Sequence, residues 1–244
     1  MDLPRRPDPA GEPDVAGAPV TPETPGTPET PSTGGTPHTH WLPGSAGSPD
    51  LFAHLRRPGR AEASVRPATA ADVPEIARIQ LVTWQTAYRA VLPPAVLDDW
   101  DGTAATEAWH AAVVAPPTPG HGVLVALDGT TVAGFAAHGP AELAADEVPF
   151  PGGPTSELMT LLVEPRWGRR GHGSRLLAAV VDLTLATGTA RLQMWLPDGD
   201  DVTARFLTAA GWAPDGWVRT LDTGATPLRQ VRWHTILDDE RGEQ

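Results

Sequence analysis

Residues 168–174 form a loop whose glycines and arginines have the types and spacing needed to bind an anion. The loop reads Gly-Arg-Arg-Gly-His-Gly-Ser. Glycines allow several backbone N–H groups to turn into one concavity, and the guanidinium groups of Arg169 and Arg170 offer planar donor pairs that match phosphate. An ordinary arginine-rich turn is the alternative interpretation. The flanking residues favour a site for a ligand that carries a pyrophosphate.

The loop stands between an expected strand and an expected helix. Leu158–Val163 is an apolar run of strand length, and Pro165 ends it because proline cannot donate to a strand ladder. From Ser174 to Ala186, leucine and valine recur at helical spacing. The start of this helix adds partial positive charge to the loop, which again favours an anion.

Two common phosphate-binding loops do not fit these residues. A P-loop needs Gly-Lys-Ser/Thr, and the chain contains no lysine. A dinucleotide fingerprint needs a third glycine, and Leu176 stands in its place. What remains is Arg-Arg-Gly-His-Gly-Ser-x-Leu-Leu behind a Leu-x-Val-x-Pro strand end.

This remaining pattern resembles the acyl-coenzyme-A-binding segment of the Gcn5-related N-acetyltransferase (GNAT) family. The family pattern Gln/Arg-x-x-Gly-x-Gly/Ala falls on residues 168–173, with Gly168 in place of the first Gln or Arg. Residues 200–212 resemble a second family segment through Phe206, Gly211 and Trp212. Leu207 replaces the tyrosine that often serves the family as proton donor to the leaving thiolate.

The resemblance implies an N-acetyltransferase that uses acetyl-CoA as co-substrate and transfers the acetyl group to an amine by direct attack. It implies that the coenzyme's pantetheine arm pairs with the central strand and that backbone N–H groups there stabilise the oxyanion. The implied coenzyme-binding residues are Leu161, Leu162, Val163, Arg169, Arg170, Gly171, His172, Gly173 and Ser174. The side chain of His172 is expected beside a phosphate or the adenine.

Acetyl transfer requires a base that deprotonates the amine. Glu157, at the start of the central strand, is our first candidate, and an exposed charge at the strand end is the alternative. His138, at the end of a neighbouring strand, is the second candidate. Glu164 lies on the loop side, where its charge would oppose phosphate, so it is a poor base.

Trp84 and Tyr88 lie four residues apart in an expected helical region. The family places its acceptor-side helices here, so the resemblance implies that both line the acceptor site. The same spacing also suits two side chains on the core face of a helix, and the sequence leaves both interpretations open.

Composition limits the function classes. The net charge of −12 argues against attraction to nucleic acid or anionic membranes. There is no cysteine, so disulfides, thiolate metal sites and a catalytic thiol are excluded. No apolar run approaches the roughly twenty residues that span a bilayer, and the N-terminus lacks a signal-like apolar region. We expect a cytoplasmic protein without a metal site, whose acceptor is a small-molecule or peptide amine; a homodimer fits the resemblance.

The chain divides into three parts by composition. Residues 1–62 contain a Pro/Thr-rich repeat and are expected to be a disordered tail. Residues 63–237 hold the expected domain, and 238–244 form an acidic tail. The order of elements predicts an α/β (α+β) fold with a mixed, mostly antiparallel central sheet flanked by helices, including a hairpin turning at Asp128-Gly129.

Three functional classes remain open. An enzyme ranks first. A module that binds acyl-CoA without catalysis ranks second, because Gly168 and Leu207 depart from the family pattern. A scaffold protein whose tail carries the function ranks third.

Overall fold

A computed structural model describes residues 63–144, 147–223 and 227–237. The expected tails, 1–62 and 238–244, lie outside the described residues. Seven strands form one sheet in the order β1-β2-β3-β4-β5-β7-β6. Neighbouring strands are antiparallel except β4 and β5, which are parallel. The predicted fold class is confirmed.

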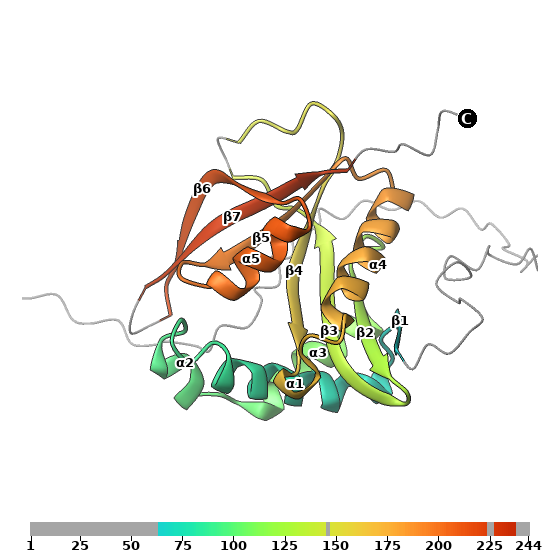
Figure 1. Cartoon of the computed structure of the whole chain (residues 1–244), viewed down its shortest axis with the longest axis vertical. Helices are drawn as coiled ribbons and strands as arrows, with labels where there is room; N and C mark the ends of the chain where they lie inside the picture. Colours follow the sequence, from blue (N-terminus) through green and yellow to red (C-terminus); the bar gives the residue numbers. More distant parts are fainter. Residues whose placement is uncertain (1–62, 145–146, 224–226, 238–244) are drawn as a thin grey trace, which may run out of the picture.

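Along the chain, β1 is followed by three α-helices, three strands, and then α4, β5, α5, β6 and β7 (Figure 1). The strands are β1 (Ala63–Pro67), β2 (Gly122–Asp128), β3 (Thr131–Pro140), β4 (Thr155–Val163), β5 (Arg191–Pro197), β6 (Ala213–Leu221) and β7 (Leu228–Ile236). The α-helices are α1 (Val73–Thr86), α2 (Pro94–Asp98), α3 (Gly102–Val114), α4 (His172–Ala186) and α5 (Asp201–Ala209). Short 3-10 turns, η2 (Ala70–Asp72) and η3 (Pro165–Trp167), precede α1 and α4.

Local sequence signals fix several boundaries. Asp72 accepts hydrogen bonds from the Thr69 backbone N–H at 2.7 Å and hydroxyl at 2.8 Å, which orders the entry to α1. Gly129 takes a φ of 59° in the predicted β2–β3 hairpin. Asp200 accepts a hydrogen bond from the Thr203 N–H at 3.0 Å and caps α5 as expected.

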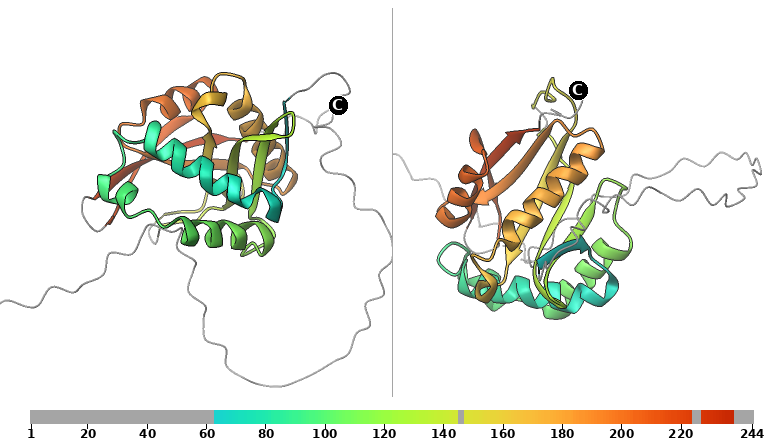
Figure 2. Two further views of the ribbon diagram at one scale, coloured as in Figure 1. Left: turned by 90° about the horizontal axis from the view of Figure 1, so that it is seen from below. Right: turned by 45° about the vertical axis from the view of Figure 1, so that its right-hand side comes forward.

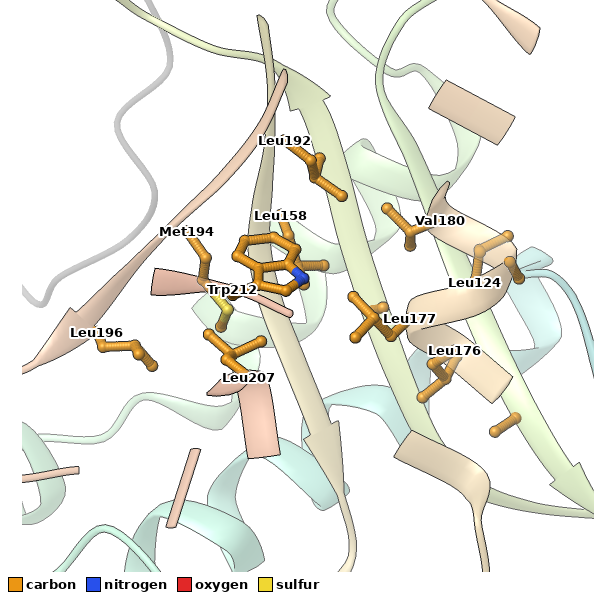
Figure 3. Close-up of a cluster of buried hydrophobic side chains, with 13 residues drawn as sticks. Leu124, Leu158, Leu176, Leu177, Val180, Leu192, Met194, Leu196, Leu207 and Trp212 are labelled. Atoms are coloured by element: carbon orange, nitrogen blue, oxygen red, sulfur yellow. The ribbon is translucent and has the colours of Figure 1, made fainter. Parts of the chain in front are cut away.

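Helices cover both faces of the sheet (Figure 2). Ile76 and Ile79 of α1 pack with Phe135 and Leu162 in one buried cluster, which α3 joins through Trp109. The opposite face carries a larger cluster beneath α4 and α5, which we call the α4-side core (Figure 3). It contains Leu124, Leu158, Leu176, Leu177, Val180, Leu192, Met194, Leu196, Leu207 and Trp212. The sheet is therefore the middle of three layers.

β4 and β5 share only a short seam. Their paired residues are Thr155 with Arg191, Ser156 with Leu192, and Glu157 with Gln193. Beyond this seam, β5, β7 and β6 turn away from β4, which Figure 1 shows clearly. In the described residues, β4 from Leu158 to Val163 therefore has strand partners only on its β3 side. We call this backbone edge the free edge of β4.

The observed elements extend a few expected ones. β4 begins at Thr155 instead of Leu158, and β6 begins at Ala213 instead of Trp217. The α4 helix begins at His172, two residues before the predicted start. In the described part of the chain, no helix is long and apolar enough to cross a membrane.

Candidate active site

The free edge of β4 exposes backbone groups at alternate residues. The Glu164 N–H donates to the Ala133 carbonyl at 2.9 Å, which makes these two residues a hydrogen-bonded pair. Because such pairs alternate in an antiparallel ladder, Leu162 also bonds to β3, whereas Leu161 and Val163 direct their N–H groups to the free edge. Leu162 is 5% exposed in the cluster beneath α1, so neither its backbone N–H nor its side chain is placed to bind a ligand there.

A β-bulge interrupts β4 next to the seam. Ala137 pairs with Thr160 and His138 pairs with Leu158, so Met159 is the extra residue. The bulge reverses the alternation of side chains: Leu158, Leu161 and Val163 all contact the α4-side core. Glu157 therefore lies on the opposite face of the sheet from Leu161 and Val163.

Residues 168–174, which we call the Gly/Arg loop, lead directly into the first turn of α4. Gly171 caps this helix with a φ of 81° and supplies no side-chain acceptor. Arg175 is the first residue whose N–H bonds back, to the Gly171 carbonyl at 3.1 Å. The N–H groups of His172, Gly173 and Ser174 precede the helical bonds, so they remain available to an anion.

Two arginines of the loop are positioned beside this turn. Arg169 is exposed and adopts a φ of 62°, the one positive φ of a non-glycine residue in the described chain. Arg170 is also exposed, and its guanidinium carbon lies 4.9 Å from the ring centre of Trp167. Neither arginine forms an ion pair with a carboxylate of the described residues. The loop thus combines unpaired positive charge with free N–H donors.

The loop and the free edge are neighbours. A Cβ placed on Gly173 would lie 3.7 Å from Leu161, Val163 and Phe206, which are side chains of β4 and α5. A residue with a larger side chain would press on all three. The structure thus brings together Leu161, Val163 and Gly173, three residues that the sequence predicted to share one ligand.

The side chain of His172 turns away from that ligand-facing surface. It is 1% exposed, and its Nε2 lies 3.2 Å from a carboxylate oxygen of Asp128 at the end of β2. The expectation that this imidazole lies beside a phosphate or adenine therefore needs correction: His172 offers its backbone N–H. The imidazole instead ties the start of α4 to the hairpin.

The negative charge of Glu164 is neutralised by arginines. Its carboxylate is paired with Arg78 at 2.8 Å and with Arg166 at 2.9 Å. The hydrogen bonds from Arg78 hold the pKa of Glu164 below its usual value, with burial opposing them. Glu164 is therefore a structural anion and, as expected from the sequence, a poor base.

Glu157 has the environment of a base. It is partly buried, and Gln193 donates an amide hydrogen bond to its Oε2 at 3.0 Å. Burial raises the pKa of Glu157, because a desolvated carboxylate is harder to ionise; the Gln193 hydrogen bond acts in the opposite direction. A raised pKa brings a carboxylate closer to neutral pH, where a base is most effective.

His138 lies on the other face of the sheet. It pairs directly with Leu158 of the α4-side core, and it is 9% exposed. Burial lowers its pKa, with a smaller contribution from His121. The structure thus does not bring the two candidate bases together.

Trp84 and Tyr88 occupy different positions relative to α1. The ring of Trp84 meets that of Trp100 edge to face, with the ring centres 5.3 Å apart. Tyr88 lies beyond the end of the helix, and its hydroxyl is 3.2 Å from the Thr203 hydroxyl on α5. Burial raises the pKa of Tyr88, so its hydroxyl stays protonated. Both rings also border the cluster beneath α1, which matches the core interpretation.

Comparison with known proteins identifies this arrangement. The family model of the acetyltransferase (GNAT) family matches residues 80–212, more than half of the chain. The chain belongs to the GNAT family. No curated protein sequence matches it.

Several solved GNAT-like structures share the fold at low identity. The yncA protein of Salmonella typhimurium, solved with its cofactor acetyl-CoA, is 18% identical, with a TM-score of 0.54 over 75% of this chain and 99% of its own. The PaiA N-acetyltransferase of Thermoplasma acidophilum, in complex with coenzyme A, is 15% identical, with a TM-score of 0.52 over 69% and 97%. A ribosomal-protein-alanine N-acetyltransferase of Brucella melitensis is 22% identical, with a TM-score of 0.55 over 71% and 99%.

This GNAT chain departs from the family pattern in α5. Leu207, which replaces the tyrosine often found there, is fully buried in the α4-side core. It can neither donate a proton nor reach a ligand at the free edge. No described residue group has three or more side chains placed to hold a metal ion.

Sequence reasoning missed several residues that the structure places around Glu157 and the free edge of β4. Gln193 holds Glu157, and Arg219 of β6 acts electrostatically on the same carboxylate. Gln193 and Arg219 lie on β5 and β6, which are far from Glu157 in the sequence. Only the folded sheet brings these residues near Glu157, so no local sequence pattern identifies them. Met159 was missed because a bulge depends on strand pairing; its side chain is 47% exposed.

Proposed function

We propose that this chain is an acyl-CoA-dependent N-acetyltransferase that moves the acetyl group of acetyl-CoA to a primary amine of a small molecule or peptide. The observation that carries the proposal is the free edge of β4, which has the Gly/Arg loop at one end and Glu157 at the other. Val163 and Glu157 are six residues apart, about 20 Å along an extended strand. An extended arm anchored at the loop fits that length.

The residues of the chain suit coenzyme binding. The N–H groups of His172, Gly173 and Ser174, with Arg169 and Arg170, would hold the pyrophosphate. Leu161 and Val163 direct backbone N–H groups to the edge, where they would pair with the amides of an extended arm or donate to the thioester oxygen. Their buried neighbours in the α4-side core fix the strand in place.

Glu157 would act as the base for direct attack. It takes the proton from the attacking ammonium group, directly or through water. The nitrogen lone pair then forms the new C–N bond to the acetyl carbon. The C–S bond breaks and its electron pair leaves with sulfur, and the nitrogen releases its second proton to solvent to give the neutral amide. Because Leu207 has no proton to give, we assign the protonation of the thiolate to solvent.

The test is the variant Glu157→Gln, assayed for thiol release over an amine panel with saturating acetyl-CoA. We expect turnover to fall about 100-fold or more, since general-base catalysis is worth roughly that factor. Acetyl-CoA affinity should stay within twofold. The matched control is Glu107→Gln, at an exposed position of α3, and it should be silent. Equal turnover in E157Q and the parent would remove Glu157 from the mechanism.

A second candidate function is a binding module without catalysis, which the buried Leu207 favours. The same assay separates the two. Coenzyme binding by calorimetry together with no thiol release across the amine panel would favour the module over the enzyme.

A further inference from the structure

The sheet face that bears Glu157 continues over β5, β7 and β6 as a charged and aromatic surface. Strand alternation puts Gln193 and Trp195 of β5 on this face, with Arg232 of β7 paired to Trp195. Trp217 and Arg219 of β6 join them, because Arg232 lies 5.1 Å from the ring centre of Trp217 and Arg219 lies 4.5 Å from that of Trp195. We call this surface the Glu157 face. It lies opposite α4 and α5, and so opposite the α4-side core.

Two arginines on this face, Arg232 and Arg191, form ion pairs with carboxylates of the protein. Arg232 is 1% exposed and pairs with Glu147 and with Asp215, both at 2.7 Å. Arg191 pairs with Glu147 at 3.0 Å. These pairs tie the segment between β3 and β4 onto the sheet. Neither guanidinium is available to a ligand, because its charge is already balanced by protein.

Arg219 differs from both. Its Nε donates to the Gln230 amide oxygen at 2.6 Å, and its guanidinium rests on Trp195. No carboxylate of the described residues forms an ion pair with it, and the residue is exposed enough to meet a ligand. The hydrogen bond and the ring fix the orientation of the guanidinium plane, so its two terminal nitrogens form a preset fork.

Arg219 is electrostatically coupled to the proposed base. Burial lowers the pKa of Arg219, whereas the charges of Glu157 and Glu142 raise it. The guanidinium has thus lost part of its hydration without gaining a direct anionic partner. A ligand carboxylate would supply the missing anionic partner, while a ligand ammonium group would be attracted to Glu157 and to Glu142, whose charges both act on Arg219.

We propose that Arg219 binds the carboxylate of the acceptor, so that the acceptor is an amino acid with a free amine directed to Glu157 and a free carboxylate directed to Arg219. This inference rests on the proposed function, because it names the acceptor class of the same site. The fork of Arg219 matches a carboxylate with two parallel hydrogen bonds, which a neutral amide cannot reproduce. Arg219 is then a specificity-determining residue.

The test compares free amino acids with their primary amides, which share the side chain and the amine but lack the carboxylate. Binding is measured by calorimetry on the full-length protein saturated with coenzyme A, and turnover by thiol release with acetyl-CoA. We expect at least one amino acid to bind about tenfold or more tightly than its amide. In Arg219→Gln that preference should vanish, through weaker binding of the acid alone. Arg219→Lys should retain part of it, because the charge remains and the fork is lost.

The matched control is Arg229→Gln. Arg229 is an exposed arginine of the neighbouring strand β7, paired with Asp198, and its loss should leave the preference unchanged. Binding of acids and amides with equal affinity, or an equal loss for both in Arg219→Gln, would overturn the proposal. Binding that depends on Arg219 without any thiol release would leave this inference standing and remove the proposed catalysis.

Discussion

At the scale of single residues, the environment of Glu157 determines when it can act. A carboxylate accepts a proton only when ionised, and burial makes ionisation of Glu157 harder. Gln193 partly offsets this by donating to the ionised form. The proposed base is therefore tuned upward from its ordinary value of 4.5, toward the pH at which amines begin to lose their protons.

This tuning predicts the pH dependence of the rate. Because the pKa of Glu157 is raised, kcat/KM should fall on the acid side as pH drops through that raised value, at higher pH than an ordinary carboxylate would give. Gln193→Leu removes the stabilising hydrogen bond and should move the acid limb to still higher pH. Initial rates from pH 5 to 9 would check both shifts. An unchanged acid limb in Gln193→Leu would contradict this role of the amide.

At the scale of elements, the helix α4 is bounded by two glycines with nearly the same backbone. Gly171 precedes it with a φ of 81° and Gly188 follows it with a φ of 80°. Both conformations disfavour a side chain for the same reason. Only Gly171 lies in the loop that presents the free N–H groups, so the two glycines make a matched pair.

We expect Gly171→Ala and Gly188→Ala each to destabilise the fold by about 1 kcal/mol, because each forces a left-handed backbone on alanine. In Gly171→Ala the new methyl group would also meet the Arg175 guanidinium, 2.8 Å away, so that flexible side chain must move, and the backbone strain falls within the loop that presents the free N–H groups. Affinity for coenzyme A should then fall several-fold in Gly171→Ala and stay unchanged in Gly188→Ala. Calorimetry and urea unfolding measure the two effects, and equal affinities would argue against the loop as the anion site.

At the scale of the whole molecule, buried carboxylates paired with arginine join distant elements. Asp72 binds Arg66 through both oxygens, at 2.7 and 2.8 Å, and connects β1 to the start of α1. Glu164 joins α1 to the end of β4, and Glu147 joins the segment before β4 to β5 and β7. Hydrogen bonds from arginine lower the pKa of all three carboxyl groups.

These lowered pKa values predict acid sensitivity of the fold. Each group stabilises the native state above its unfolded pKa, and this contribution is lost as pH falls through the folded pKa. For Asp72 the folded pKa is about 2, against an ordinary 3.8. Asp72→Asn should lower the free energy of unfolding by about 1–3 kcal/mol at pH 7, and the difference should shrink between pH 4 and 2. Urea midpoints across this range would check the sign; a difference that grows with acid would contradict it.

Much of the fold followed from local signals. The β2–β3 hairpin forms where predicted, although its two turn residues are Gly129 and Thr130, one residue later than expected. Asp200 caps α5, and the Gly/Arg loop leads into α4 as predicted. The sheet face on which each site residue lies could not be predicted from the sequence. One bulge residue, Met159, reverses the alternation of side chains along β4 on which such a prediction rests. Strand alternation alone would have put Glu157 beside Leu161.

Contacts between residues that are far apart in the sequence also could not be predicted from the sequence alone. Arg219 and Glu157 are separated by two intervening strands of the sheet, and their coupling depends on the order β4-β5-β7-β6. The turn of His172 toward Asp128 depends on the hairpin meeting α4. The types of residue were enough to identify the Gly/Arg loop, whereas the orientation of side chains such as His172 and Arg219 depends on the packing of the whole fold.

The short seam between β4 and β5 divides the sheet into two halves, β1–β4 and β5–β7, which are joined at one corner. Three residue pairs hold the halves in register, and the side chains packed beneath α4 and α5 provide the other contacts between them. A coenzyme stretched along β4 would fill the missing rungs of that ladder. Coenzyme binding would then stiffen the β4–β5 junction, so that strands β1–β4 and strands β5–β7 would move less relative to one another when the coenzyme is bound.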